Sequence, residues 1–130
     1  MKVMVGIGCD RGTSLQTLQD ALMQALKQGG LDVSAVVGLA SIDKKNDEQA
    51  ILQLAAVQGW PLYFYPAEVL AKIQVPNPSE VVMKYMGTPA VAEAAALQAA
   101  NTDIQNLLVE KYKYLGANGK NATVSIARMT

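Results

Sequence analysis

Three short segments of the sequence carry residue types that could bind an anion or move a proton. The first, Gly6–Ser14 (GIGCDRGTS), places glycines and Arg11 directly before a predicted helix. Glycine lets the backbone turn sharply, and the free N–H groups that begin a helix attract anions. Arg11 would add a planar, two-pronged donor for a carboxylate or phosphate. Gly8, Gly12 and Thr13 are therefore candidate ligand-binding residues, and the Gly12 and Thr13 amides are candidate donors to an oxyanion.

Two other interpretations of this segment stay open. It could be no more than a tight strand-to-helix turn with a Ser14 cap. It also resembles the dinucleotide-binding fingerprint, although its spacing, G-x-G-x-x-x-G, is one residue longer than the standard pattern. Asp43, after the second predicted strand, could bind a ribose, about ten residues later than usual. A nucleotide- or dinucleotide-binding module is thus an alternative function.

Cys9 lies within the same segment, where a helix dipole and Arg11 could lower the pKa of its thiol. A thiolate nucleophile also needs a base, and the sequence contains no histidine. We therefore expect Cys9 to lie beside a bound ligand without acting as a nucleophile.

The other two segments lie further along the chain. Ala40–Glu48 (ASIDKKNDE) offers Asp43 as an acid or base and Lys44 as a partner for a carboxylate, or it is only a charged, solvated loop that caps a helix. Gly87–Glu93 (GTPAVAE) begins a predicted helix at its Thr-Pro pair, and the first N–H groups of that helix form a second candidate anion site. Glu93 would fall about one turn into this helix, which makes Asp43 and Glu93 candidate general bases.

Composition excludes several classes of protein. Of the 130 residues, 51% are hydrophobic and 17% are charged, a balance that excludes intrinsic disorder. The 11 basic and 11 acidic residues cancel, so net charge gives no reason to expect a nucleic-acid or membrane partner. One cysteine cannot form an intrachain disulfide, and without histidine a Ser-His-Asp site or a histidine-ligated metal site is impossible. We expect no metal, no cofactor, no targeting or membrane-spanning segment, and a cytoplasmic location.

The hydrophobic pattern predicts strands that alternate with helices, as in an α/β fold with a mostly parallel sheet. Strands are expected over residues 2–7, 33–40, 61–65, 107–115 and 122–129, with the last two joined as a hairpin. Helices are expected from a Ser14 cap to Gly29, from an Asn46 or Asp47 cap to Val57, and over residues 66–73, 79–86 and 90–100. Alternation of residue types in the last strand predicts that it is half exposed.

Five motifs in series resemble one family. GIGCDRGTS, LASIDKKNDE, VPNPSEVV, GTPAVAEAAAL and ATVSIARM occur in the order and spacing of the C-terminal domain of the cobalamin biosynthesis protein CbiG, which also exists as the separate protein CobE. The resemblance runs from Val3 to Arg128, which indicates one domain over residues 1–130.

This resemblance implies a three-layer α/β/α fold with a mixed, mostly parallel sheet that ends in an antiparallel hairpin. It also implies a role at the corrin-ring stage of cobalamin (vitamin B12) synthesis, in which the chain binds or helps process a precorrin or cobalt-precorrin. The full-length family enzyme, cobalt-precorrin-5A hydrolase, opens a lactone and releases acetaldehyde. Its N-terminal and central domains have no counterpart in this sequence, so hydrolysis by this chain alone is not expected.

The family's motifs can be matched to this sequence residue by residue. The glycine-rich loop corresponds to Gly6, Gly8, Cys9, Arg11, Gly12 and Thr13, the second motif to Ser41, Ile42, Asp43 and Lys44, and the third to Gly87, Thr88, Pro89, Glu93 and Ala94. Asp10 stands where a basic or neutral residue is expected. Because corrin precursors are flat and rich in carboxylates, Arg11, Lys44 and two helix starts would form a carboxylate-binding rim.

Three hypotheses about function result. The first is binding or processing of a precorrin-type tetrapyrrole, with the three segments converging on one cleft. The second is the nucleotide-binding module. The third is a protein-interaction domain that docks on other corrin-synthesis enzymes or on a separate N-terminal portion of the hydrolase. Titration with precorrins, NAD and ATP would separate the first hypothesis from the second.

Overall fold

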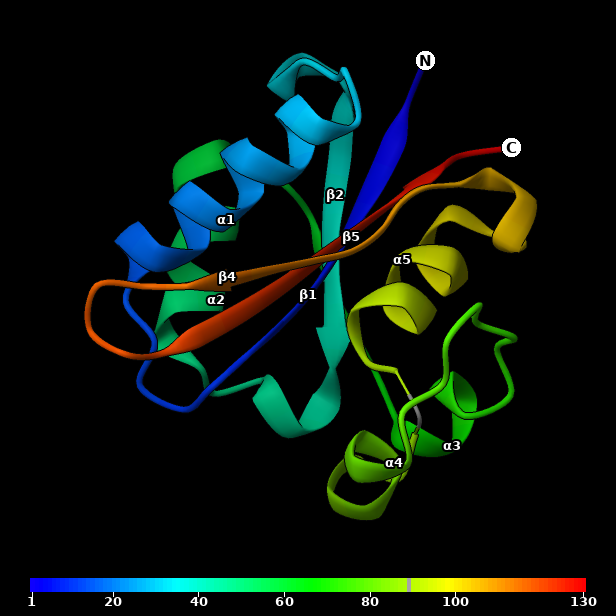
Figure 1. The fold of residues 1–130 in the computed structure, drawn as a ribbon. Helices are drawn as coiled ribbons and strands as arrows, with labels where there is room; N and C mark the ends of the chain where they lie inside the picture. The colour runs from blue at the N-terminus through cyan, green and yellow to red at the C-terminus, as the bar shows by residue number, and fades with distance from the viewer. Residues whose placement is uncertain (89) are drawn as a thin grey trace.

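A mixed sheet forms the middle layer of the molecule, for which the computed structural model describes residues 1–88 and 90–130 (Figure 1). Within these residues the five strands stand in the order β3-β2-β1-β5-β4. Their bounds are Val3–Cys9 for β1, Val36–Ile42 for β2, Leu62–Tyr65 for β3, Leu107–Leu115 for β4 and Asn121–Arg128 for β5. β1 pairs in parallel with β2, and β2 with β3, whereas β5 runs antiparallel to both β1 and β4. The mixed sheet with a closing hairpin confirms the predicted fold class.

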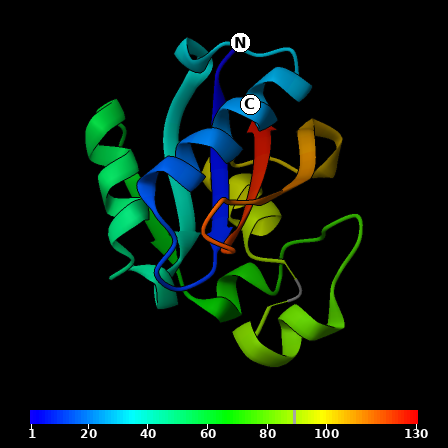
Figure 2. The same ribbon diagram turned by 60° about the vertical axis from the view of Figure 1, so that its left-hand side comes forward.

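Helices cover both faces of this sheet (Figures 1 and 2). α1 (Leu15–Gln28) and α2 (Gln49–Gln58) lie on one face, and α5 (Ala92–Ala100) lies on the other. The short helices α3 (Ala67–Leu70) and α4 (Glu80–Met86) lie on the α5 side, toward the carboxyl end of β2. No helix among the described residues is long and apolar enough to cross a bilayer. The cytoplasmic location stays a prediction.

The N-terminal cap and the apolar stripe predicted for α1 are both present in the structure. The Ser14 side chain accepts a hydrogen bond from the Thr17 N–H at 3.2 Å and caps the helix, as predicted. Leu18, Leu22 and Leu26 repeat every four residues and are at most 1% exposed. They pack with strand residues in one buried cluster, so burial of one apolar face holds α1 on the sheet.

On the opposite face, the alanine-rich helix α5 approaches the sheet very closely at β1. A Cβ atom built on Gly6 would lie 1.9 Å from the Ala92 carbonyl oxygen and 2.7 Å from the Ala96 nitrogen. These distances are far below van der Waals contact, so only glycine fits between β1 and α5 at this position. The small side chains of α5 permit the same close approach.

Two predicted boundaries near β2 were wrong, for local reasons. Residues 33–35 form a 3₁₀ turn rather than the start of a strand, because the Asp32 carboxylate accepts a hydrogen bond from the Ser34 N–H. The strand therefore begins at Val36 and extends to Ile42. α2 begins at Gln49 after Glu48, and not after a side-chain cap at Asn46 or Asp47.

Boundaries also differ on the α5 side of the sheet. α3 ends at Leu70 instead of residue 73, and α5 begins at Ala92, with no side-chain cap at Val91. Thr88 is fully buried, and its hydroxyl donates to the Ala90 carbonyl oxygen at 3.4 Å instead of capping the helix. The predicted Thr-Pro helix start includes Pro89, which lies outside the described residues.

The last strand is more buried than its alternating sequence predicts. Four successive residues, 124–127, are buried in β5. The reason is the position of the strand, because β5 lies between β1 and β4 and is covered by α1 on one face and α5 on the other. The prediction of a half-exposed strand was therefore wrong.

Candidate functional site

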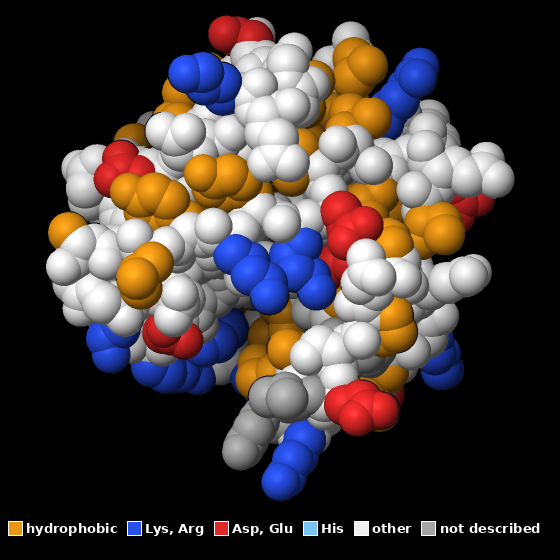
Figure 3. Space-filling view, viewed as in Figure 1, with side chains coloured by type: hydrophobic (Ala, Val, Ile, Leu, Met, Phe, Trp, Pro, Cys, Tyr) orange, Lys and Arg blue, Asp and Glu red, His pale blue; other side chains and the backbone are white. Residues whose placement is uncertain are grey.

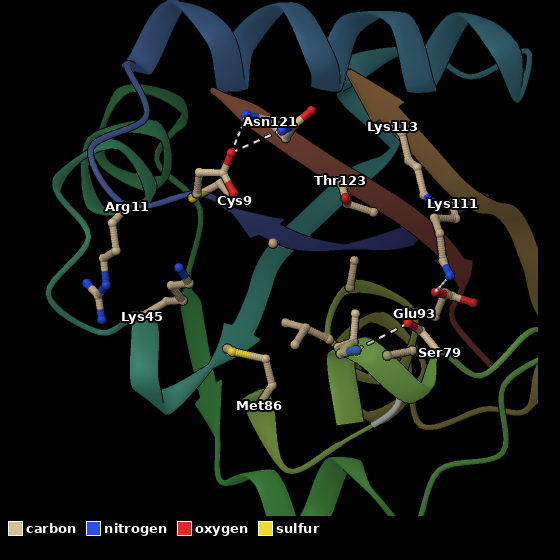
Figure 4. Close-up of a pocket in the computed structure, with 16 residues that line it drawn as sticks. Cys9, Arg11, Lys45, Ser79, Met86, Glu93, Lys111, Lys113, Asn121 and Thr123 are labelled. Atoms are coloured by element: carbon tan, nitrogen blue, oxygen red, sulfur yellow. Dashed lines mark hydrogen bonds and ion pairs between the residues drawn. The ribbon is translucent and has the colours of Figure 1, made fainter. Parts of the chain in front are cut away.

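A pocket of about 370 Å³ opens beside the carboxyl end of β1, on the face of the sheet that α5 covers (Figure 4). Residues from five parts of the chain line it: Gly8, Cys9, Asp10 and Arg11 at the end of β1, Lys45 after β2, Ser79, Val82 and Met86 at α4, Ala90–Glu93 at the start of α5, and Lys111, Lys113, Asn121 and Thr123 in the hairpin. Such an edge is where α/β sheets commonly bind ligands. The three predicted segments do converge here, each through at least one residue.

Arg11 joins the loop after β1 to the loop after β2. Its Nη1 atom donates to Asp47 Oδ1 at 2.5 Å and to Glu48 Oε2 at 3.3 Å. Its Nη2 atom donates to the Lys44 carbonyl oxygen. The guanidinium was predicted to hold a ligand carboxylate, yet it already has two carboxylate partners within the protein. We therefore assign Arg11 to holding the two loops together at the pocket rim.

The amides predicted to stabilise an oxyanion are also engaged. The Gly12 N–H donates to Glu48 Oε1 at 2.9 Å, and the Glu48 side chain is only 6% exposed. The Thr13 N–H donates to the Asp10 carbonyl oxygen at 3.3 Å, and the Thr13 hydroxyl donates to the same oxygen at 2.6 Å. Neither Gly12 nor Thr13 lines the pocket. These two amides are therefore not free donors.

Two further contacts fix the segment that contains α4 against the sheet. The Lys44 ammonium donates to the Met86 carbonyl oxygen at 3.1 Å. Asn77 Nδ2 donates to Glu110 Oε2 on β4 at 2.7 Å. Lys44 thus joins the second predicted segment to α4, which supplies an apolar wall of the pocket, and does not itself line the cavity.

Lysine side chains stand on two sides of the pocket. Figure 4 shows Lys45 with Arg11 on one side and Lys111 with Lys113 on the other. In the space-filling view, basic side chains gather over β4 and again across a hollow in which hydrophobic side chains are visible (Figure 3). Between them the wall is apolar, with Met86 and Val91 among its members. This arrangement suits a ligand with an apolar body and carboxylates at its edge.

Glu93 is the buried acid of the pocket. Its side chain is 1% exposed, and its Oε1 atom lies 3.3 Å from Lys111 Nζ. Its Oε2 atom has no hydrogen-bond partner among the described residues. Burial raises the pKa of the Glu93 carboxyl, and the positive charge of Lys111 opposes this effect. A buried, half-satisfied carboxylate in a cleft is a mark of a functional site.

The raised pKa predicts how Glu93 affects folding stability. Because the folded state holds the Glu93 proton more tightly than the unfolded chain, stability should fall as pH rises from the ordinary value of 4.5 through the raised pKa. We expect Glu93→Gln, which cannot titrate, to lack this contribution. Urea unfolding of both proteins between about pH 4 and about pH 8 should show the difference in unfolding free energy shifting in favour of the variant as pH rises. A difference that does not change with pH would contradict the assignment.

Cys9 does not have the activated thiol that the sequence suggested. It is half-buried, and this burial raises the pKa of its thiol, while Lys45 has a smaller, opposing effect. The interpretation that the pKa of this thiol is lowered was wrong, because the effect of burial exceeds that of the nearby positive charge. The Arg11 guanidinium is turned toward the β2 loop. The expectation that Cys9 is no nucleophile stays a prediction.

Asp10 connects the pocket wall at the end of β1 to the hairpin through Asn121. Its Oδ2 atom accepts hydrogen bonds from the Asn121 backbone N–H at 2.8 Å and from Asn121 Nδ2 at 3.1 Å. These bonds hold the pKa of Asp10 below its ordinary value. Asp10 departs from the basic or neutral residue expected at its position, and in the structure it joins the β1 loop to the start of β5.

The other predicted site residues lie around the pocket and not in its wall. Ser41 is fully buried, and its hydroxyl donates to the Ile7 carbonyl oxygen at 2.7 Å, which ties β2 to β1. Asp43 begins an exposed 3₁₀ turn. Gly87 ends α4 with a left-handed backbone (φ 77°), and Thr88 is buried behind it. Of the sequence-predicted residues, Gly8, Cys9, Arg11 and Glu93 line the pocket.

The hairpin residues were missed by sequence reasoning. Lys111 and Lys113 are two positions apart on β4, so both side chains lie on the same face of the strand. This spacing was a usable signal, but nothing local showed which face of β4 meets the start of α5. Among the described residues, no group of three or more His, Cys, Asp or Glu side chains could hold a metal ion.

Comparison with known proteins agrees with this architecture. The family described as "Cobalamin synthesis G C-terminus" matches residues 3–127. A cobalt-precorrin-5A hydrolase from Priestia megaterium is 31% identical over 95% of this chain, which spans 31% of the length of that relative. A CobE protein from a Sinorhizobium species is 34% identical over 84% of this chain and 71% of its own length.

Solved structures show the same fold. A crystal structure of CobE, a protein of the cobalamin (vitamin B12) biosynthetic pathway, superimposes with a TM-score of 0.84 at 33% identity and covers 99% of this chain and 91% of that one. The cobalamin biosynthesis protein chiG from Agrobacterium tumefaciens gives a TM-score of 0.68 at 25% identity, with 98% of each chain covered. The chain belongs to the cobalamin synthesis G C-terminus family, and its role lies in cobalamin biosynthesis.

Proposed function

We propose that the pocket beside β1 binds one edge of a precorrin-type tetrapyrrole. The observation that carries this proposal is the placement of Lys45, Lys111 and Lys113 on two sides of an apolar wall. A relative of this chain is named for its action on cobalt-precorrin-5A, and CobE belongs to the same pathway. Precorrins combine an apolar ring system with many carboxylates, which is the chemistry that such a pocket accepts.

Lysine suits this task better than the arginine predicted from the sequence. An ammonium on a flexible stem can follow carboxylates that themselves end flexible side chains, whereas a guanidinium binds a carboxylate best in one fixed, two-pronged geometry. Arg11 and Lys44, the predicted carboxylate-binding pair, are engaged in joining loops. We therefore propose that Lys45 and the hairpin residues Lys111 and Lys113 form the carboxylate-binding rim, in place of Arg11 and Lys44.

Glu93 is our candidate for any proton transfer to the bound ligand. Of the two predicted bases, Glu93 lines the pocket and Asp43 does not. The chain spans 31% of the Priestia hydrolase, so we propose that it supplies ligand binding to the reaction for which that relative is named. A separate N-terminal portion of such a hydrolase, or another corrin-synthesis enzyme, is the proposed protein partner.

A nucleotide-binding function has less support from the geometry. A phosphate at the glycine-rich turn would need the Gly12 amide, which already binds the buried Glu48 carboxylate. It would also lie close to that negative charge. The pocket is formed instead on the hairpin side of Arg11.

Calorimetric titration with two matched corrins tests the proposal. Dicyanocobyrinic acid carries seven carboxylates, and dicyanocobinamide carries amides in their place on the same ring. We expect the acid to bind at least about tenfold more tightly than the amide, since one charged hydrogen bond contributes about that factor. Added salt should weaken the binding of dicyanocobyrinic acid and leave the binding of dicyanocobinamide nearly unchanged. Equal binding of both corrins, or binding of NAD or ATP in their place, would contradict the proposal.

A further inference from the structure

The ion pair between Lys111 and Glu93 lies in the wall of the proposed binding pocket. Lys111 is on β4 and Glu93 is in the first turn of α5, and Lys111 Nζ is 3.3 Å from Glu93 Oε1. The Lys111 side chain is 20% exposed and lines the pocket, whereas the Glu93 side chain is 1% exposed. An anion entering the pocket can therefore reach the ammonium, but it meets little of the carboxylate.

The Glu93 carboxylate depends on this one lysine. Its Oε2 atom is buried without a hydrogen-bond partner among the described residues, so Oε1 makes the one polar contact that the structure gives to the group. Burial raises the pKa of Glu93, and Lys111 is the first of the charges that oppose the shift. A carboxylate in this position stays ionised only while its cation remains beside it.

The other charged groups around Glu93 do not replace Lys111. On β4, Lys113 lowers and Glu110 raises the pKa of Glu93, and both effects are smaller than that of Lys111. The pocket wall at the end of β1 contains three titratable groups, Cys9, Asp10 and Arg11. The pKa of the Cys9 thiol is raised. After β2, the wall contains Lys45. The pocket residues of α4 and β5, which include Val82 and Thr123, are uncharged.

We infer that Lys111 changes partners when a ligand binds: a ligand carboxylate takes the Lys111 ammonium from Glu93, and Glu93 takes up one proton from the solvent. This inference rests on the proposed function, because it needs a ligand that brings a carboxylate into the pocket. Charge balances in the exchange. One anion enters, one proton follows it, and the buried side of the pocket holds one cation and one anion before and after binding.

The physical reason is that two carboxylates cannot share one ammonium at the edge of a low-dielectric wall. The ligand carboxylate keeps contact with water through the open side of the pocket and so ionises at little cost. The buried Glu93 carboxyl has no such contact and is the group that becomes neutral. Glu93 thus holds Lys111 in place in the empty pocket and competes with the ligand for it.

Proton uptake can be measured on the unmodified chain. Binding of dicyanocobyrinic acid is followed by calorimetry at pH 7 in phosphate, HEPES and Tris, buffers with different ionisation enthalpies. The seven ligand carboxylates are already ionised at this pH, so the free ligand has no carboxylate that must lose or gain a proton. We expect the observed enthalpy to rise with buffer ionisation enthalpy, with a slope that indicates uptake of up to one proton. A slope of zero would overturn the inference.

The Glu93→Gln variant removes the competing charge and keeps the size of the side chain. With uptake of one proton, the affinity of the unmodified chain should weaken by up to about tenfold per pH unit between pH 7 and pH 8, and that of the variant should not change. At pH 8 the variant should bind the acid as tightly as the unmodified chain or more tightly. A purely structural role of the ion pair predicts weaker binding by the variant at every pH.

The matched control is Glu80→Gln, which makes the same chemical change in the first turn of α4, at an exposed residue outside the pocket wall. It should keep both the buffer dependence and the pH dependence. The two proposals fail separately. If the unmodified chain does not bind the acid in preference to dicyanocobinamide, the proposed function is wrong. If it does bind the acid but takes up no proton, only the exchange at Lys111 is wrong.

Discussion

Gly6→Ala should be the most destabilising single-methyl change in this chain, with an expected loss of about 3 kcal/mol or more in the free energy of unfolding. The added Cβ atom would lie 1.9 Å from the Ala92 carbonyl oxygen and 2.7 Å from the Ala96 nitrogen. Both are backbone atoms of α5, so no side chain can rotate away. Either α5 moves away from β1, which also displaces the pocket residues at the start of α5, or the helix unwinds locally. Urea unfolding measures the loss.

Gly8→Ala is the matched control on the same strand. Its added Cβ atom would lie 3.7 Å from Val91 Cγ1, an ordinary van der Waals distance, and the backbone at Gly8 has no positive φ. Alanine is preferred to glycine within a strand by about 0.5–1 kcal/mol, so we expect this variant to match or slightly exceed the parent in stability. If Gly6→Ala and Gly8→Ala unfold at the same urea concentration, the contact between α5 and β1 is wrongly placed.

Reversing two lysine charges should give the largest loss of ligand affinity. In the double variant Lys45→Glu/Lys113→Glu, carboxylates would replace the ammonium groups on opposite sides of the pocket, and the Lys111–Glu93 pair would stay intact. Charge pairs near a protein surface contribute about 1–4 kcal/mol at contact, so two reversals should weaken the binding of dicyanocobyrinic acid about a hundredfold. Calorimetric titration at a fixed salt concentration provides the measurement.

The control for this variant is Lys2→Glu/Lys27→Glu, which changes the net charge by the same amount. Lys2 precedes β1 and Lys27 is in the last turn of α1, so both lie toward the opposite end of the sheet from the pocket. At physiological salt, charges beyond about 8 Å from the ligand are largely screened, so the affinity should change little. Equal losses in the two double variants would show that the ligand responds to net charge and not to this pocket.

The fold could be predicted from the sequence wherever one local signal decided the structure. Ser14 caps α1 because its hydroxyl meets the Thr17 N–H, an interaction within four residues. The glycine that ends α1 and the hairpin between β4 and β5 have equally local signals. The predictions of helix caps and of burial were wrong where a contact between residues distant in the sequence determines the structure. Glu48 lies at the cap of α2 while its carboxylate binds Gly12, and β5 is buried because of its neighbours in the sheet.

The site was harder to predict for the same reason. Glycines and Arg11 beside a helix start looked like an anion site, but the Glu48 carboxylate, about thirty-six positions away, fills it as an internal anion. Lys111 and Lys113 come from a strand whose register with the rest of the sheet is irregular between Val109 and Tyr112. No pattern within β4 indicates that it places these lysines opposite α5. Glu93 was predicted correctly as a pocket residue because it falls about one turn into a helix that begins at this edge of the sheet.

The most direct test of the central claim is to map where the ligand binds. Amide chemical shifts of the ¹⁵N-labelled chain are followed by NMR as dicyanocobyrinic acid is added. The account predicts that the largest changes occur at Gly8–Asp10, Ala90–Glu93 and the hairpin residues Lys111, Lys113 and Thr123, which surround the pocket. The second cavity, at Asn101 and Asn106 near the end of α5, should not respond. Changes centred on that cavity, or at the Gly12–Ser14 turn without the hairpin, would contradict the account.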